Sequence, residues 1–73
     1  KLYLSANQIS DISPLASLTN LEWLSLDSNQ VSDISPLVSM TDAEINLEGN
    51  RLNQESLNVH VPNLRARVVG VSV

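Results

Sequence analysis

The fold follows from the stretch Leu24-Ser25-Leu26-Asp27-Ser28-Asn29-Gln30-Val31-Ser32-Asp33-Ile34-Ser35-Pro36-Leu37, because the same pattern occurs twice in the chain. The first copy begins 22 residues earlier, at Leu2, and repeats the same sequence of apolar, asparagine and Ser-Pro-Leu positions. A third, partial copy covers residues 45–52 with an offset of 21 at its asparagine, so one residue is missing near residues 41–44. Such a period is typical of a solenoid, in which each coil buries its apolar side only against neighbouring coils.

Each copy predicts a short strand followed by a short helical turn, which makes the fold class α/β. The alternation Leu24-Ser25-Leu26 has the period of a strand with one buried face. Ser13-Pro14 and Ser35-Pro36 predict helix starts, with serine as the N-cap and proline at the first helical position. The strands should therefore be parallel and lie on one side of the coils, with the helical turns on the other. The expected core is Leu2, Leu4, Ile9, Ile12, Leu15, Leu18, Leu21, Leu24, Leu26, Val31, Ile34, Leu37, Met40, Ala43, Ile45, Leu47 and Leu52.

Asparagines Asn7, Asn29 and Asn50 occupy the turn after each predicted strand. A side-chain amide in this place can satisfy backbone groups that the turning chain leaves unpaired, so the three should stack as a structural ladder. The alternative is that these amides bind a ligand. All three fit the repeat, which favours the structural role.

The last repeat predicts a longer helix than the first two. Asn53 can cap a helix over residues 54–60, and Pro62 should prevent its continuation. Leu57 and Val61, four positions apart, should face the core. The valines at 69, 71 and 73 should then form a closing edge strand.

Composition excludes several classes of function. The 73 residues contain no cysteine, one histidine and only four Lys and Arg, with a net charge of -4. A disulfide framework, a cysteine-built zinc site and a nucleic-acid surface are thereby excluded, and no cofactor is implied. No apolar run approaches the ~20 residues needed to cross a bilayer. The chain begins at Lys1 inside a predicted strand, so we expect a fragment of about three coils over residues 1–73 that can self-associate through its uncapped first coil.

Neither a catalytic nor a metal site is favoured by the residues present. His60 would need a serine and an aspartate in a triad, but serine is abundant here for backbone reasons. Asp27, Glu44 and Glu48 could bind calcium from neighbouring strands, although a solvated acidic face is the simpler interpretation. The sequence therefore predicts a protein that is not an enzyme.

The strand positions that alternate with the buried leucines should form the concave surface. Because aromatic side chains are enriched among binding hot spots, the two aromatic residues at these positions indicate recognition of a ligand. A basic or apolar partner would suit the acidic residues beside them. The alternative is a spacer whose coils extend a larger solenoid without contacting a ligand. The candidate binding residues are Tyr3, Ser5, Trp23, Ser25, Asp27, Glu44, Asn46 and Glu48.

Residues 2–37, with their twice-written Asn-Gln-Ile/Val-Ser-Asp-Ile-Ser-Pro-Leu, resemble the short leucine-rich repeats of bacterial internalins. Residues 47–67 resemble the closing repeat at the C-terminal end of many bacterial leucine-rich-repeat domains. The resemblance implies a curved solenoid that binds a protein or glycan on its concave side, carries no catalytic residues and is secreted or displayed on a cell surface. The chain departs from the family at Val68, where a glycine is usual and where a turn with positive φ would strain a valine.

Overall fold

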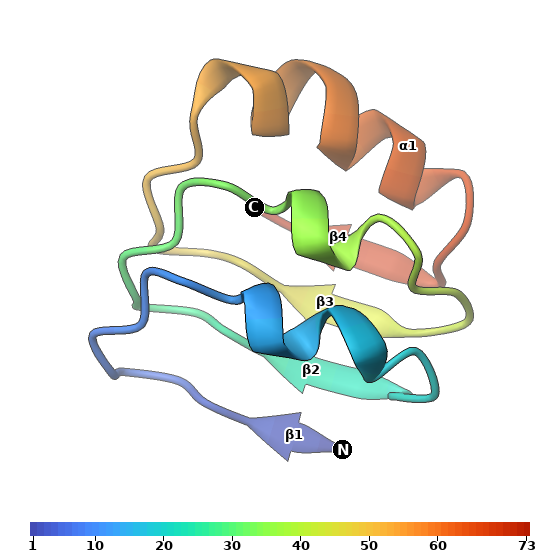
Figure 1. Cartoon of the computed structure of the whole chain (residues 1–73), viewed down its shortest axis with the longest axis horizontal. Coiled ribbons are helices and arrows are strands. Elements are labelled where there is room, and N and C mark those ends of the chain that lie inside the picture. Colours follow the sequence, from blue (N-terminus) through green and yellow to red (C-terminus); the bar gives the residue numbers. More distant parts are fainter.

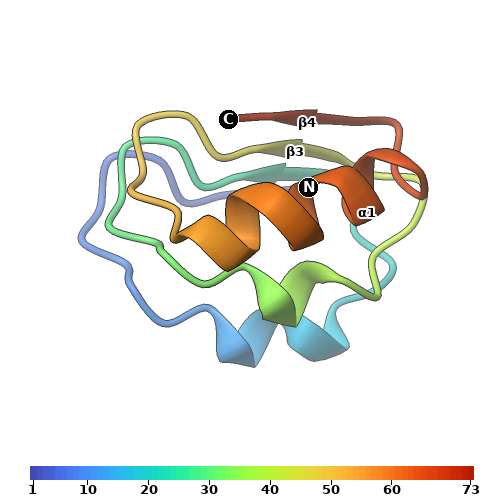
Figure 2. The ribbon, with the colours of Figure 1, turned by 90° about the horizontal axis from the view of Figure 1, so that it is seen from above.

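The computed structural model describes all residues, 1–73, and contains one parallel sheet with strand order β1-β2-β3-β4 (Figure 1). The four strands lie along one side of the coils, and the helical segments lie along the other (Figure 2). None of the helices is long and apolar enough to cross a bilayer. The strands are β1 at Leu2–Tyr3, β2 at Trp23–Ser25, β3 at Glu44–Asn46 and β4 at Gly70–Ser72.

The strand register confirms the repeat offsets. Leu2 pairs with Leu24, an offset of 22, and Leu24 pairs with Ile45, an offset of 21. The second coil is shorter on its helical side, since the 3-10 helix η2 at Ser35–Leu37 has three residues and η1 at Ser13–Ser17 has five.

The helical turns begin at the predicted serines, but those serines are not the caps. Neither Ser13 nor Ser35 caps its helix through its side chain. Instead the Asp11 carboxylate accepts a hydrogen bond from the Ser13 N–H at 3.0 Å, and Asp33 accepts one from the Ser35 N–H at 2.9 Å. In each turn, a carboxylate two residues upstream accepts a hydrogen bond from one free N–H at the start of the helix. The aspartate, and not the serine, therefore caps the turn.

The predicted core is confirmed apart from one residue. Fourteen apolar residues form one buried cluster, and the leucines and isoleucine at positions 2, 4, 9, 21 and 52 pack against it while partly exposed. Leu18 is 42 % exposed, whereas Met40, its counterpart one coil later, is 1 % exposed. Leu18 belongs to the first coil, which has a neighbouring coil on one side only.

The asparagines after the second and third strands each join their own coil to the preceding one. The Asn29 carbonyl oxygen Oδ1 accepts hydrogen bonds from the N–H groups of Asn7 and Ile9, both at 3.1 Å. Its Nδ2 donates to the carbonyl oxygens of Leu4 at 2.9 Å and Leu26 at 3.0 Å. Nδ2 also donates to the Asp27 carbonyl at 3.2 Å, so one buried amide bonds five backbone groups in two coils.

The third coil repeats the arrangement at Asn50. Its Oδ1 accepts from the Val31 N–H at 2.9 Å, and its Nδ2 donates to Leu26 and Leu47, each at 2.9 Å. The side chain of Asn7 donates only within its own coil, to the carbonyl oxygens of Leu4 at 3.0 Å and Ser5 at 3.1 Å.

A left-handed backbone conformation precedes each of these asparagines. Ala6, Ser28 and Gly49 have φ angles of 56°, 59° and 74°. Only the third copy uses glycine, and a Cβ there would lie 3.2 Å from the Ser28 backbone nitrogen. Glycine at 49 therefore serves both the positive φ and the close stacking of two coils.

The final helix extends further than the sequence predicted. Asn53 caps it as expected, since its Oδ1 accepts from the Ser56 N–H at 2.7 Å. A π-helical turn, η3 at Ser56–His60, leads directly into the α-helix α1 at Val61–Arg65, so Pro62 does not end the helix. The Val61 N–H bonds to the Ser56 carbonyl, and this wider turn accommodates a proline that would disrupt a regular α-helix.

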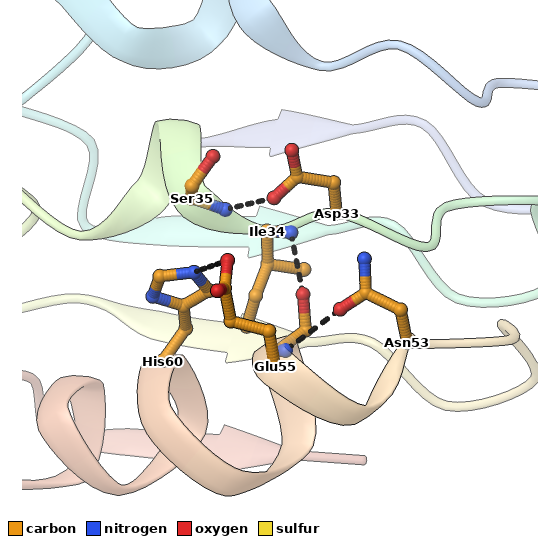
Figure 3. A network of polar contacts seen from close by, with 7 residues as sticks. Asp33, Ile34, Ser35, Asn53, Glu55 and His60 are labelled. Atoms are coloured by element: carbon orange, nitrogen blue, oxygen red, sulfur yellow. Dashed lines mark hydrogen bonds and ion pairs between the residues drawn. The ribbon is translucent and has the colours of Figure 1, made fainter.

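The inward face of this helix also differs from the prediction. Val61 is buried as expected, but Leu57 is 45 % exposed and Ser56 is completely buried in its place. The Ser56 hydroxyl accepts a hydrogen bond from the buried Ile34 N–H at 3.0 Å (Figure 3). A buried N–H without a hydrogen-bond partner costs more free energy than a further buried leucine would gain, which explains why a serine occupies this core position.

The closing strand is shorter than the valine pattern predicted. Val71 packs on the core, while Val69 and Val73 are exposed. Val68 is buried, donates its N–H to the Leu64 carbonyl at 2.8 Å and is not among the residues with positive φ. The expected strain at Val68 is therefore wrong.

Replacing Asn29 with alanine should lower the free energy of unfolding by about 1–3 kcal/mol, because buried backbone groups in two coils lose their partners. Replacing the exposed Ser32 with alanine should change it by less than about 0.5 kcal/mol. Urea denaturation of both variants measures the difference. Equal and small effects would contradict a structural role for the amide.

Candidate binding face

The sheet turns one face toward the helical segments and leaves the other uncovered (Figure 2). Strand pairing arranges the uncovered side chains in rows: Trp23, Glu44 and Gly70 form one row, and the next begins at Tyr3. We call this surface the open face. Its members are Tyr3, Ser5, Trp23, Ser25, Asp27, Glu44, Asn46, Glu48, Gly70 and Ser72.

The two aromatic residues lie on either side of Ser25. Tyr3 is 63 % exposed and pairs with Ser25 on the neighbouring strand. Trp23 is half-buried, and its indole Nε1 donates a hydrogen bond to the Ser25 hydroxyl at 2.8 Å. This bond holds the indole along its own strand.

Ser25 is therefore not available to a ligand, contrary to the prediction. It is only 6 % exposed, although it belongs to the open face. The strand alternation was assigned correctly, but the indole two residues earlier covers the small hydroxyl side chain. Ser25 contributes to the open face by fixing Trp23.

A hollow lies beside Trp23, over β3 and β4. Its volume is ≈ 120 Å³, and its walls include Trp23, Glu44, Asn46 and Ser72. Gly70 leaves space in the row that contains Trp23 and Glu44, since a Cβ at Gly70 would meet nothing within 4 Å. The absence of a side chain at Gly70 thus keeps the hollow open.

Three acidic residues lie on the same face of the sheet as this hollow, and one of them, Glu44, lines it. Glu44 and Glu48 are exposed on β3 and just beyond it, and Asp27 is half-buried after β2. The Asn46 side chain accepts a hydrogen bond from the Glu48 N–H at 3.0 Å, which fixes the end of the strand. No group of three or more His, Asp or Glu side chains comes close enough to hold a metal ion.

The sequence pattern did not predict that Gly70 and Ser72 belong to the open face. The segment between the third and fourth strands does not follow the repeat, so its pairing register had no periodic signal. The alternating valines indicated the closing strand, and Val71 packs on the core as that alternation implies, but the residues between the valines were not considered. Gly70 itself was a usable signal, because a glycine inside a strand often marks a place where another group approaches closely.

His60 lies on the other side of the molecule, in the middle of the final helix (Figure 3). Its Nε2 is buried, lies 3.4 Å from the Glu55 carboxylate and lacks a hydrogen bond of good geometry. The nearby Ser56 hydroxyl bonds to the Ile34 N–H instead. The structure therefore brings no serine hydroxyl into hydrogen-bond contact with the imidazole.

The repeats also have counterparts among known families. A family model described as Leucine Rich repeats (2 copies) matches residues 1–41. The match covers the first coil and most of the second, including β1, β2 and both 3-10 helices. A comparison with curated proteins found no match to this chain.

Within the matched region, the equivalent carboxyl groups of Asp11 and Asp33 share one electrostatic property. The Ser13 N–H, followed by the Ser13 hydroxyl, lowers the pKa of Asp11 below its ordinary value of 3.8. The Ser35 backbone and hydroxyl groups lower the pKa of Asp33 in the same way. Both bonds favour the charged carboxylate, so folding is linked to pH at these two turns.

We expect the combined change of Asp11 and Asp33 to asparagine to make the fold less sensitive to acid. Because the folded pKa lies below the unfolded value of 3.8, the carboxylates stabilise the fold fully above that value and lose their effect as the pH falls through the folded pKa. Asparagine retains an acceptor oxygen but does not titrate. Urea titrations between neutral pH and about pH 2 should show a smaller loss of stability in the variant than in the parent.

The matched control is Glu48→Gln, which removes an exposed carboxyl group on the open face. It should leave the acid-dependent loss close to that of the parent. A double variant that loses stability as steeply as the parent would contradict the linkage.

Proposed function

Because the chain belongs to the leucine-rich-repeat family, we propose that it recognises another protein through the open face of its sheet. Leucine-rich repeats commonly mediate protein–protein interaction. The core, the asparagines and the helical side serve the fold, whereas most side chains of the open face make no contribution to the apolar core.

The observation that carries this proposal is the placement of both aromatic residues on the uncovered side. Tyr3 exposes most of its surface and Trp23 part of it, and the two flank the same serine. Large aromatic side chains anchor many protein interfaces because they bury much area with few rotatable bonds. The acidic rim would add orientation and a faster encounter with a basic partner.

Two further parts of the proposal rest on the sequence pattern. The twice-written Asn-Gln-Ile/Val-Ser-Asp-Ile-Ser-Pro-Leu supports an internalin-like bacterial protein, and that origin favours a secreted or cell-surface location. The lack of a nucleophile, base and orienting group in one place supports a binding role rather than catalysis. We propose a protein as the ligand rather than a glycan because the aromatic pair and the acidic rim extend over several strands.

Trp23→Ala should weaken partner binding by about 2 kcal/mol or more, roughly a thirtyfold rise in Kd. It should lower the free energy of unfolding by only about 1 kcal/mol, since the indole is half-exposed and its removal lets water reach Ser25. Peptides selected from a phage-displayed random library against the chain provide the partners. Their Kd values for parent and variant are then measured by calorimetry.

The control is Val59→Ala, which removes an exposed apolar side chain from the helical side. It should leave the Kd values unchanged. Peptides whose Kd is unchanged by Trp23→Ala but raised by Val59→Ala would show that recognition occurs on the helical side. A library that gives no binders would favour the alternative, a spacer within a larger solenoid.

A further inference from the structure

We propose that the hollow beside Trp23 binds a single lysine or arginine side chain of the partner protein. This inference rests on the proposed function and specifies the chemistry of its central contact. It follows from three separate properties of the hollow: its size, its charge and its aromatic wall.

The size suits the end of one long side chain. The hollow has a volume of ≈ 120 Å³, well below the ~300–1,000 Å³ of pockets for drug-sized molecules. Its floor is formed by β3 at Ile45, whose side chain packs into the core on the opposite face, and Gly70 keeps it open toward β4. A linear, flexible side chain can lay its methylene groups along such a floor and place its charged end at the rim.

The charge selects a cation. Glu44 forms part of the wall, and no lysine or arginine lines the hollow. Asp27 and Glu48 add negative charge on the same face of the sheet. An anionic side chain would be repelled there, and a neutral apolar one would gain nothing from the carboxylate. Asn46 and Ser72 offer polar atoms that can accept hydrogen bonds from an ammonium or guanidinium group.

The aromatic wall strengthens the same preference. Tryptophan attracts cations more strongly than the other aromatic side chains, and arginine and lysine are its usual partners. The bond from the indole Nε1 to Ser25 already fixes the ring in the free protein. Binding therefore requires little additional ordering of Trp23, which reduces the entropic cost of the contact.

The experiment uses four capped peptides, Gly-Ser-Xaa-Ser-Gly with lysine, arginine, leucine or glutamate at the centre. Each is titrated into the isotope-labelled chain while the NMR signals of the Trp23 indole N–H and of the Asn46 and Gly70 amides are followed. The lysine and arginine peptides should shift these signals with Kd values in the millimolar range, and added salt should weaken them. The leucine and glutamate peptides should cause little change.

Two variants test the assignment of the hollow. Gly70→Val should abolish the shifts by filling the hollow, yet keep the thermal midpoint, because its Cβ has room and valine favours a strand. Glu44→Gln should raise the Kd about two- to fivefold, as expected for one exposed charge pair.

Equal shifts with the leucine peptide, no shift with lysine or arginine, or lysine shifts that survive Gly70→Val would overturn the inference. If selected library peptides still depend on Trp23 in that case, recognition through the open face stands and only its cation preference fails. If the lysine peptide binds the hollow but no selected partner depends on Trp23, the proposed function fails and the cation site remains.

Discussion

The structure depends on one constraint, which is that a chain turning sharply after every short strand must still satisfy its backbone polar groups. The asparagine side chain solves this problem in each coil. Asn29 accepts from two N–H groups of the preceding coil and donates to carbonyl oxygens of both coils. Because its amide bonds across the boundary, the same residue that closes one coil also holds the preceding coil in register.

With this arrangement, most of the side chains that stabilise the fold lie on one side of the sheet. The leucines and isoleucines of the strands point toward the helical segments and fill the core, whereas most outward side chains of the strands do not contribute to the core. The bond between Trp23 and Ser25 is the exception, and it orders a surface aromatic ring. The result is an ordered indole beside the space above Gly70, with Glu44 lining the same hollow.

The sequence alone predicts most of the repeat, because the periodic residues carry a signal that occurs at least twice. Strand phase, the apolar core and the places of the asparagines all follow from it. Apart from the repeated Ser13 and Ser35, which do not cap their turns, the main errors concern residues without such a signal. Ser56 is buried to serve one N–H of the second coil, and a polar residue at a core position cannot be inferred from hydrophobic spacing. The helix passes Pro62 by means of a π-helical turn, an irregularity that propensity does not encode.

The candidate face was only partly predictable for the same reason. Alternation correctly placed Tyr3, Trp23 and Glu44 on one surface. It could not show that the indole covers Ser25, which depends on a side-chain bond within β2. Nor could it show that Gly70 pairs with Glu44, which depends on a contact between two coils.

The most direct test of the account is the quenching of Trp23 fluorescence by small ions, because the chain has a single tryptophan. A half-exposed indole on an acidic open face should be quenched by both caesium and iodide ions. Relative to its quenching of free N-acetyltryptophanamide, caesium should be the more effective of the two at low ionic strength. The advantage of caesium should shrink in Glu44→Gln. An indole that neither ion reaches would show that Trp23 belongs to the core. Iodide quenching that exceeds caesium quenching, each relative to the free compound, would show that the face is not acidic around Trp23, and either result would contradict this description of the open face.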